Sequence, residues 1–122
     1  VKIDQIIFEG TIYSLNQVSA DVLSRSWITW IFQPLGYVLM TGHYNFEKIK
    51  DEFPKIPVLL IHSKKDPVIS YKQSEHLYEA LPEPKCLKII PEMTHINSGN
   101  VMNGKYRQEI LGFLEKKECN KN

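Results

Sequence analysis

Apolar residues along the chain fall into short continuous runs and helical spacings. Three runs, at residues 4–10, 57–62 and 86–91, have the length and composition of strands. The run at 57–62 is apolar at consecutive positions instead of alternating, which is typical of a strand covered on both faces in a parallel sheet. Lys88 interrupts the last run and indicates a strand near the sheet edge.

Helical patterns separate these runs. Residues 14–17 and 70–73 both read S-x-x-Q, the form of a capping box, so we expect a helix to begin at each. The second helix should bury Leu77 and Leu81 and end before Pro82. A short helix capped by Asn45 and a last amphipathic helix complete the pattern. The residues that define the last helix are Tyr106, Ile110, Phe113 and Leu114.

Alternating strands and helices predict the fold class. Right-handed crossovers between such strands give a parallel sheet with flanking helices on both faces, an α/β fold. We expect one domain over residues 1–122, with a helical insertion at 13–55 and a polar tail at 116–122. Three strands make a small sheet, and the first would offer an unpaired edge.

Charge and cysteine content exclude several classes of protein. Fifteen basic against fourteen acidic residues leave a net charge of +1, so no global field attracts nucleic acid. Cys86 and Cys119 are too few for a disulfide framework, which favours a reducing, cytoplasmic location. The chain begins at Val1 without a signal peptide and resembles a piece of a longer chain. The uncharged stretch from Ser26 to Phe46 contains proline and glycine and lacks the apolar length of a transmembrane helix.

Candidate chemistry lies after the second and third strands. Asp66 follows the strand at 57–62 by four residues, and His95 follows Pro91 by four. Because ligands and catalytic groups gather beyond the carboxyl ends of parallel strands, these loops can bring a carboxylate to an imidazole. Taken singly, Asp66 reads as a turn residue and His95 as a loop histidine. Taken together, their separation of 29 residues holds one helix and one strand, the minimum that returns the chain to the same edge of the sheet, where an Asp could orient a His that removes a proton from a nucleophile.

The other histidines and the glycines suggest no metal or cofactor. His43, His62, His76 and His95 lack the HxxxH and HExxH spacings of zinc sites, and His62 reads as a packing residue at a strand end. The glycines form no phosphate-binding loop. We therefore expect neither a metal nor a cofactor.

The segment from Ile56 through Asp66 to His95 resembles the acid and histidine segments of the α/β-hydrolase superfamily, in its serine hydrolase and acyl-peptidase-like members. Residues 6–10 with Ser14 and Leu15 are similar to the strand and helix that follow the nucleophile in that superfamily. The resemblance implies a carboxyl-terminal half of the domain, with His95 as general base and Asp66 as its orienting partner. The loops depart from the family pattern at Ser63 and at residues 92–94.

The nucleophile of this family is absent from the sequence. No G-x-S-x-G turn and no oxyanion-hole motif occur. We therefore expect an amino-terminal half as partner, a small acyl substrate with no nucleic acid, and hydrolysis of an ester, thioester or amide by the complete protein. The alternative is a non-catalytic remnant or an interaction module.

Aromatic residues within the helical insertion are candidates for substrate binding. They lie where the resembled family inserts cap residues over its site, and they are Trp27, Trp30, Phe32 and Tyr37. A plain core position is the competing interpretation, and contact with a membrane surface stays open.

Overall fold

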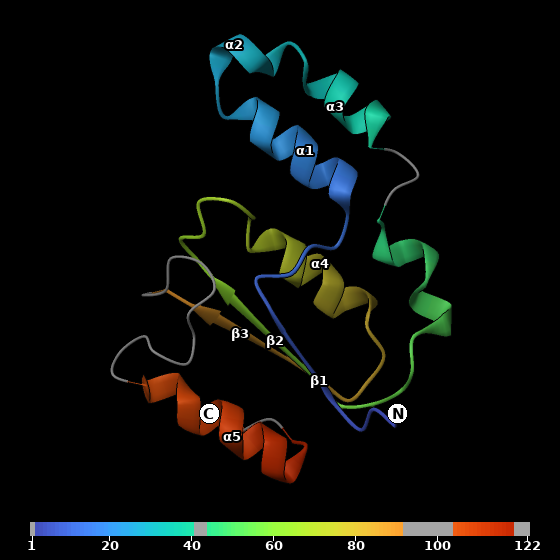
Figure 1. Ribbon diagram of the computed structural model, residues 1–122, viewed down its shortest axis with the longest axis vertical. Coiled ribbons are helices and arrows are strands. Elements are labelled where there is room, and N and C mark those ends of the chain that lie inside the picture. Colours follow the sequence, from blue (N-terminus) through green and yellow to red (C-terminus); the bar gives the residue numbers. More distant parts are fainter. Residues whose placement is uncertain (1, 41–43, 92–103, 119–122) are drawn as a thin grey trace.

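The computed structural model describes residues 2–40, 44–91 and 104–118 of the chain. Three parallel strands form one sheet in the order β1 (Ile6–Glu9), β2 (Val58–Ser63) and β3 (Lys85–Ile90), as Figure 1 shows. The three apolar runs are therefore strands, and the predicted α/β fold class is confirmed. β3 lies at the sheet edge, as Lys88 indicated, and the Lys88 ammonium pairs with Glu109 at 2.8 Å.

Helices and helical turns connect and cover these strands. The helices are α1 (Leu15–Ser24), α2 (Trp27–Trp30), α3 (Gln33–Leu39), α4 (Lys72–Ala80) and α5 (Lys105–Lys116), and the 3₁₀ turns are η1 (Phe46–Lys48) and η2 (Lys50–Glu52). α4 and α5 lie on opposite sides of the sheet, whereas α1, α2 and α3 extend from one end of the molecule (Figure 1).

The strand β2 supplies both layers of the core. Val58 and Leu60 are fully buried on the side of α4, where they join Leu77 and Leu81. The alternate residues of β2 point to the other face, because successive side chains of a strand alternate. There Leu59 and Ile61 pack with the α5 residues Tyr106 and Phe113. A strand buried on both faces explains the continuous apolar run in the sequence.

The capping boxes do not form, although the helices begin near the predicted residues. Ser14 is the N-cap of α1, but its hydroxyl pairs with the Asn16 side chain and makes no bond to the helix backbone. The Gln17 side chain accepts a hydrogen bond from Gln73 Nε2 at 3.3 Å instead of reaching back. In the second box the Ser70 hydroxyl accepts from the backbone N–H of Lys72 at 3.4 Å, but the Gln73 side chain does not reach back, because its oxygen accepts from the backbone N–H groups of Tyr13 and Ser14. Partners distant in sequence thus took both glutamine side chains away from the helix ends.

The expectation of reduced cysteines is wrong for Cys86. This residue of β3 is disulfide-bonded, while Cys119 lies outside the described residues. A cysteine inside an apolar strand gives no sequence signal of what lies beside it in space. In the described parts of the chain, no helix has the length and apolar character to cross a membrane.

Candidate active site

Asp66 lies in the loop that follows β2, and its carboxylate organises that loop. Its Oδ1 atom accepts hydrogen bonds from the backbone N–H groups of Val68 at 2.8 Å and Ile69 at 2.9 Å. These bonds have the form of an Asx turn, which agrees with the reading of Asp66 as a turn residue. The side chain is only 1% exposed, however, so the carboxylate is held inside the protein beyond the carboxyl end of the strand.

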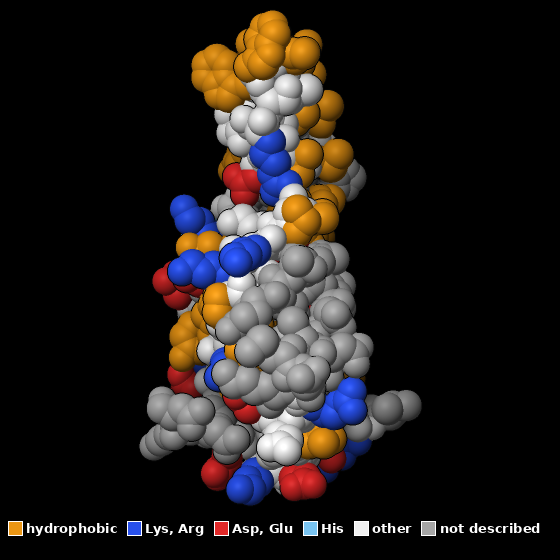
Figure 2. Space-filling model, turned by 90° about the vertical axis from the view of Figure 1, so that its left-hand side faces the viewer, with side chains coloured by type: hydrophobic (Ala, Val, Ile, Leu, Met, Phe, Trp, Pro, Cys, Tyr) orange, Lys and Arg blue, Asp and Glu red, His pale blue; other side chains and the backbone are white. Residues whose placement is uncertain are grey.

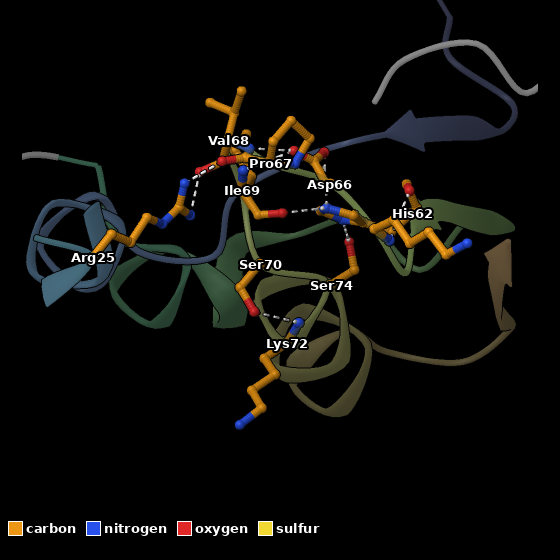
Figure 3. A network of polar contacts seen from close by, with 11 residues as sticks. Arg25, His62, Asp66, Pro67, Val68, Ile69, Ser70, Lys72 and Ser74 are labelled. Carbon is orange, nitrogen blue, oxygen red and sulfur yellow. Dashed lines mark hydrogen bonds and ion pairs between the residues drawn. The ribbon is translucent and has the colours of Figure 1, made fainter. Parts of the chain in front are cut away.

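The second carboxylate oxygen of Asp66 faces a buried histidine. His62 Nε2 lies 3.4 Å from Asp66 Oδ2 and 3.1 Å from the carbonyl oxygen of Ile69, and the ring is fully buried (Figure 3). The other ring nitrogen, Nδ1, lies 2.6 Å from the hydroxyl of Ser74 on α4. Since a carbonyl oxygen only accepts, Nε2 carries the proton toward Ile69 and Asp66. In the neutral ring, Nδ1 then accepts the hydrogen of the Ser74 hydroxyl.

His62 therefore does more than pack at a strand end, and the sequence interpretation of this residue was incomplete. Its ring connects β2, the Asp66 loop and α4 through polar contacts. The sequence held one signal for this arrangement, a histidine at the carboxyl end of a strand four residues before Asp66. Nothing in the sequence singled out Ser74, because its contact with His62 depends on how α4 packs against β2.

The strands β2 and β3 end side by side, so the loops that follow them leave the sheet at the same edge. Ser63, the last residue of β2, pairs with Ile90, the last residue of β3. The backbone N–H of Lys64 also donates to the Ile90 carbonyl at 3.0 Å. Asp66 follows Ser63 by three residues and His95 follows Ile90 by five. His95 itself lies outside the described residues, so its predicted pairing with Asp66 stays a prediction.

Arg25 joins the helical insertion to the Asp66 loop. This residue is the C-cap of α1, and its guanidinium donates to the carbonyl oxygens of Pro67 and Val68, the latter at 2.9 Å (Figure 3). A cleft of about 530 Å³ is lined by Arg25, Asp66 and Ser70 among other residues of α1 and the loop. The helical insertion and the loop that contains Asp66 therefore line the same cleft.

The four aromatic candidates lie at the surface of α2, α3 and their connection. Trp27 is 85% exposed, Trp30 59%, Phe32 49% and Tyr37 47%, so the interpretation of these residues as plain core is wrong. None of the four is among the residues that line the cleft beside Asp66. Their role in substrate binding stays a prediction. The apolar spacing in the sequence did not reveal that the side chains of α2 and α3 are exposed.

A second cleft, of about 740 Å³, lies between α4 and the turns η1 and η2. Tyr13 and Glu47 line it, and the Tyr13 hydroxyl donates to the Glu47 carboxylate at 2.5 Å. Burial and this hydrogen bond raise the pKa of Tyr13 to about 12. The hydrogen bond from Lys50, and then that from Tyr13, lower the pKa of Glu47. No group of three or more His, Cys, Asp or Glu among the described residues is placed to hold a metal ion.

A family model and several sequence relatives match the chain. The model described as "Serine aminopeptidase, S33" matches residues 34–97, just over half of the chain. The protein YfhR of Escherichia coli K12 is 39% identical over 113 residues, which cover 89% of this chain and 39% of that protein. The protein YqkD of Bacillus subtilis is 31% identical over 94 residues, covering 71% of this chain and 30% of that protein. The chain thus spans about two fifths or less of these relatives.

Solved structures show the same arrangement of strands and helices. The esterase Pf2001 of Pyrococcus furiosus matches 93% of this chain with a TM-score of 0.67, at 15% sequence identity, and 45% of the esterase is covered. A second crystal form of that esterase gives a TM-score of 0.65. At this identity the likeness concerns the fold alone. The family match over more than half of the chain establishes that the chain belongs to the serine aminopeptidase S33 family of the α/β-hydrolase superfamily.

Proposed function

We propose that this chain is the carboxyl-terminal part of a serine hydrolase that cleaves a carboxylic ester, thioester or amide. In this proposal His95 acts as general base and then general acid, and Asp66 orients it and stabilises the imidazolium. The observation that carries the proposal is the buried Asp66 carboxylate, fixed by two backbone N–H groups just beyond the end of β2. The shared edge at which β2 and β3 end supports a meeting of the two loops.

The nucleophile and the oxyanion donors must come from outside these 122 residues. The sequence has no G-x-S-x-G turn, and it spans 39% of the YfhR protein of Escherichia coli K12. β1 is an edge strand in the described sheet and pairs with β2, so its other side offers a place for a further strand. We propose that an amino-terminal half extends the sheet there and supplies a serine on a strand-to-helix turn.

Substitutions at the two proposed triad positions test this function in a complete domain. Asp66→Asn keeps an oxygen that can accept from Val68 and Ile69, so the loop should hold while the carboxylate charge is lost. We expect turnover of short acyl esters to fall roughly a thousandfold or more, and His95→Ala to lower it as far. The matched controls are Asp51→Asn and His76→Ala, since both residues are exposed. Full activity in both triad variants would refute the assignment.

A labelling experiment on the 122-residue chain addresses the missing nucleophile. A fluorophosphonate reacts with an activated serine, and this chain should take up no label because it lacks the turn that activates one. Stoichiometric labelling of any serine in the chain would contradict the proposal. If labelling is absent and the complete domain is also inert, the alternative of a non-catalytic remnant is favoured.

A further inference from the structure

The end of the molecule formed by α2 and α3 presents a continuous apolar surface, which we name the apolar tip (residues 27–39). Figure 2 shows hydrophobic side chains gathered at this end of the long axis. Nine of its large apolar side chains are 47% or more exposed: Trp27, Ile28, Trp30, Ile31, Phe32, Leu35, Tyr37, Val38 and Leu39. The two tryptophans alone offer about 300 Å² if a fully exposed ring presents about 200 Å². With the seven other exposed side chains added, the patch exceeds the few hundred Å² that monomeric proteins usually leave uncovered.

The exposed side chains belong to the outward face of a packed helical unit. α3 approaches α1 at Gly36, where an added Cβ would collide with the Leu23 side chain. This close approach fixes which side of α3 faces inward. Leu35, Val38 and Leu39 are more than half exposed although α3 packs on α1. The apolar tip is therefore a surface that the fold directs outward.

The chemistry of the apolar tip matches a lipid–water interface. No Asp, Glu, Lys or Arg occurs from Ser26 to Phe46, so no ionised group would have to leave water when the tip enters an apolar phase. Trp27, Trp30 and Tyr37 are of the two residue types that prefer the headgroup level of a bilayer. Protein–protein interfaces, in contrast, surround their apolar centre with a polar rim and are rich in arginine.

The position of the apolar tip allows contact with a flat surface. It lies at one end of the longest axis of the molecule, beyond α1 and distant from the sheet (Figure 1). A planar bilayer can reach it without meeting the charged residues around the sheet. α2 has four residues and α3 seven, far below the roughly 20 needed to span the hydrocarbon core, so the tip can lie in the interface but cannot cross it.

From these observations we propose that the apolar tip inserts into the interface of a lipid bilayer and holds the protein at the membrane surface. The contact is apolar and uncharged, so it needs no anionic lipid. The proposal is independent of the hydrolase function, because it uses neither Asp66 nor His95.

Tryptophan fluorescence reports on this surface directly. The chain has two tryptophans, and both lie in the apolar tip. On addition of phosphatidylcholine vesicles we expect the emission to move to shorter wavelength and the protein to float with the vesicles. Because the contact is apolar, raising the salt concentration from about 0.1 M to about 1 M should change the affinity for vesicles by less than about twofold. Anionic phosphatidylglycerol vesicles should bind equally well within about threefold.

Charge substitutions locate the contact. Ile31→Asp and Val38→Asp place a charge in the exposed apolar tip and should weaken vesicle binding at least about tenfold. Leu111→Asp is the matched control, since Leu111 is 50% exposed on α5, and it should change binding less than about twofold. Circular dichroism of each variant checks that the fold is kept.

Four outcomes would overturn the proposal. The first is no flotation with either lipid. The second is binding that requires phosphatidylglycerol and disappears in high salt, which would assign it to basic residues elsewhere. The third is a concentration-dependent emission shift with self-association in sedimentation velocity and no effect of vesicles, which would assign the apolar tip to a second copy of this chain. The fourth is equal loss of binding in Leu111→Asp and in the tip variants.

Discussion

The buried polar contacts around His62 should stabilise the fold to a measurable degree. The perturbation is His62→Leu, which keeps a side chain of similar volume at the end of β2 and removes both ring nitrogens. The fully buried Ser74 hydroxyl, 2.6 Å from Nδ1, then has no partner at that position. The Ile69 carbonyl, 3.1 Å from Nε2, also loses its contact with the ring.

The magnitude follows from these two contacts. A buried polar group left without its hydrogen bond costs about 1–3 kcal/mol, and leucine returns part of that through apolar burial. We expect the free energy of unfolding to fall by about 2–4 kcal/mol. Ser74→Ala removes the Ser74 contact alone and should cost about 1 kcal/mol. Because the two residues share a bond, the double variant should lose about 1 kcal/mol less than the sum of the single variants.

Urea unfolding followed by far-ultraviolet circular dichroism measures these differences. The free energy of unfolding falls by about 1–3 kcal/mol per molar of urea, so His62→Leu should lower the midpoint of the unfolding transition by about 1 M or more. His76→Leu is the matched control: His76 is exposed on α4, and its replacement should change the free energy of unfolding by less than about 0.5 kcal/mol. A His62→Leu variant as stable as the parent, or additive losses in the double variant, would refute the reasoning.

Two further predictions concern stability. Tyr13 is protonated in the fold up to about pH 12 against 10.0 ordinarily, so the folded chain holds more protons in this range and stability should fall as the pH rises from 10 toward 12. Urea unfolding across that range should show a smaller decline for Tyr13→Phe; equal declines would contradict the assignment. Leu60→Ala in the fully buried centre of β2 should cost about 3 kcal/mol, whereas Leu111→Ala on the surface should cost less than about 1 kcal/mol. Calorimetry checks this pair, and equal losses would contradict the burial pattern.

The pattern of apolar residues predicted the sheet because a parallel strand that is buried on both faces needs a continuous apolar run, which a short stretch of sequence shows directly. β2 has to be apolar at consecutive positions when both of its faces are covered, and all six residues of β2, five of them from the predicted run, are buried in the structure. Lys88 placed β3 at the edge, since a charged side chain inside a sheet needs access to water or an ion partner. Asp66 was found for a related reason, its position just after a strand.

Tertiary structure alone decided which polar side chains became partners. Gln17 completes the sequence of a capping box, yet its side chain bonds to Gln73 of a distant helix. The His62 contact with Ser74 exists because α4 packs against β2. Side-chain hydrogen bonds depend on distances of tenths of an ångström between elements, and a linear pattern carries no such distances.

The sheet could be predicted from local sequence, whereas the exposure of the apolar tip could not. The sequence shows that residues 27–39 are apolar and uncharged, but a core helix, a pocket wall and an exposed surface share that composition. Whether such a segment is covered depends on where the chain directs it, and here α3 packs on α1 at Gly36 instead of on the sheet. Local sequence thus determined which elements form and which faces of β2 are apolar. Only the packing of those elements decided that Trp27 meets solvent and that His62 meets Asp66, because both follow from contacts between segments distant along the chain.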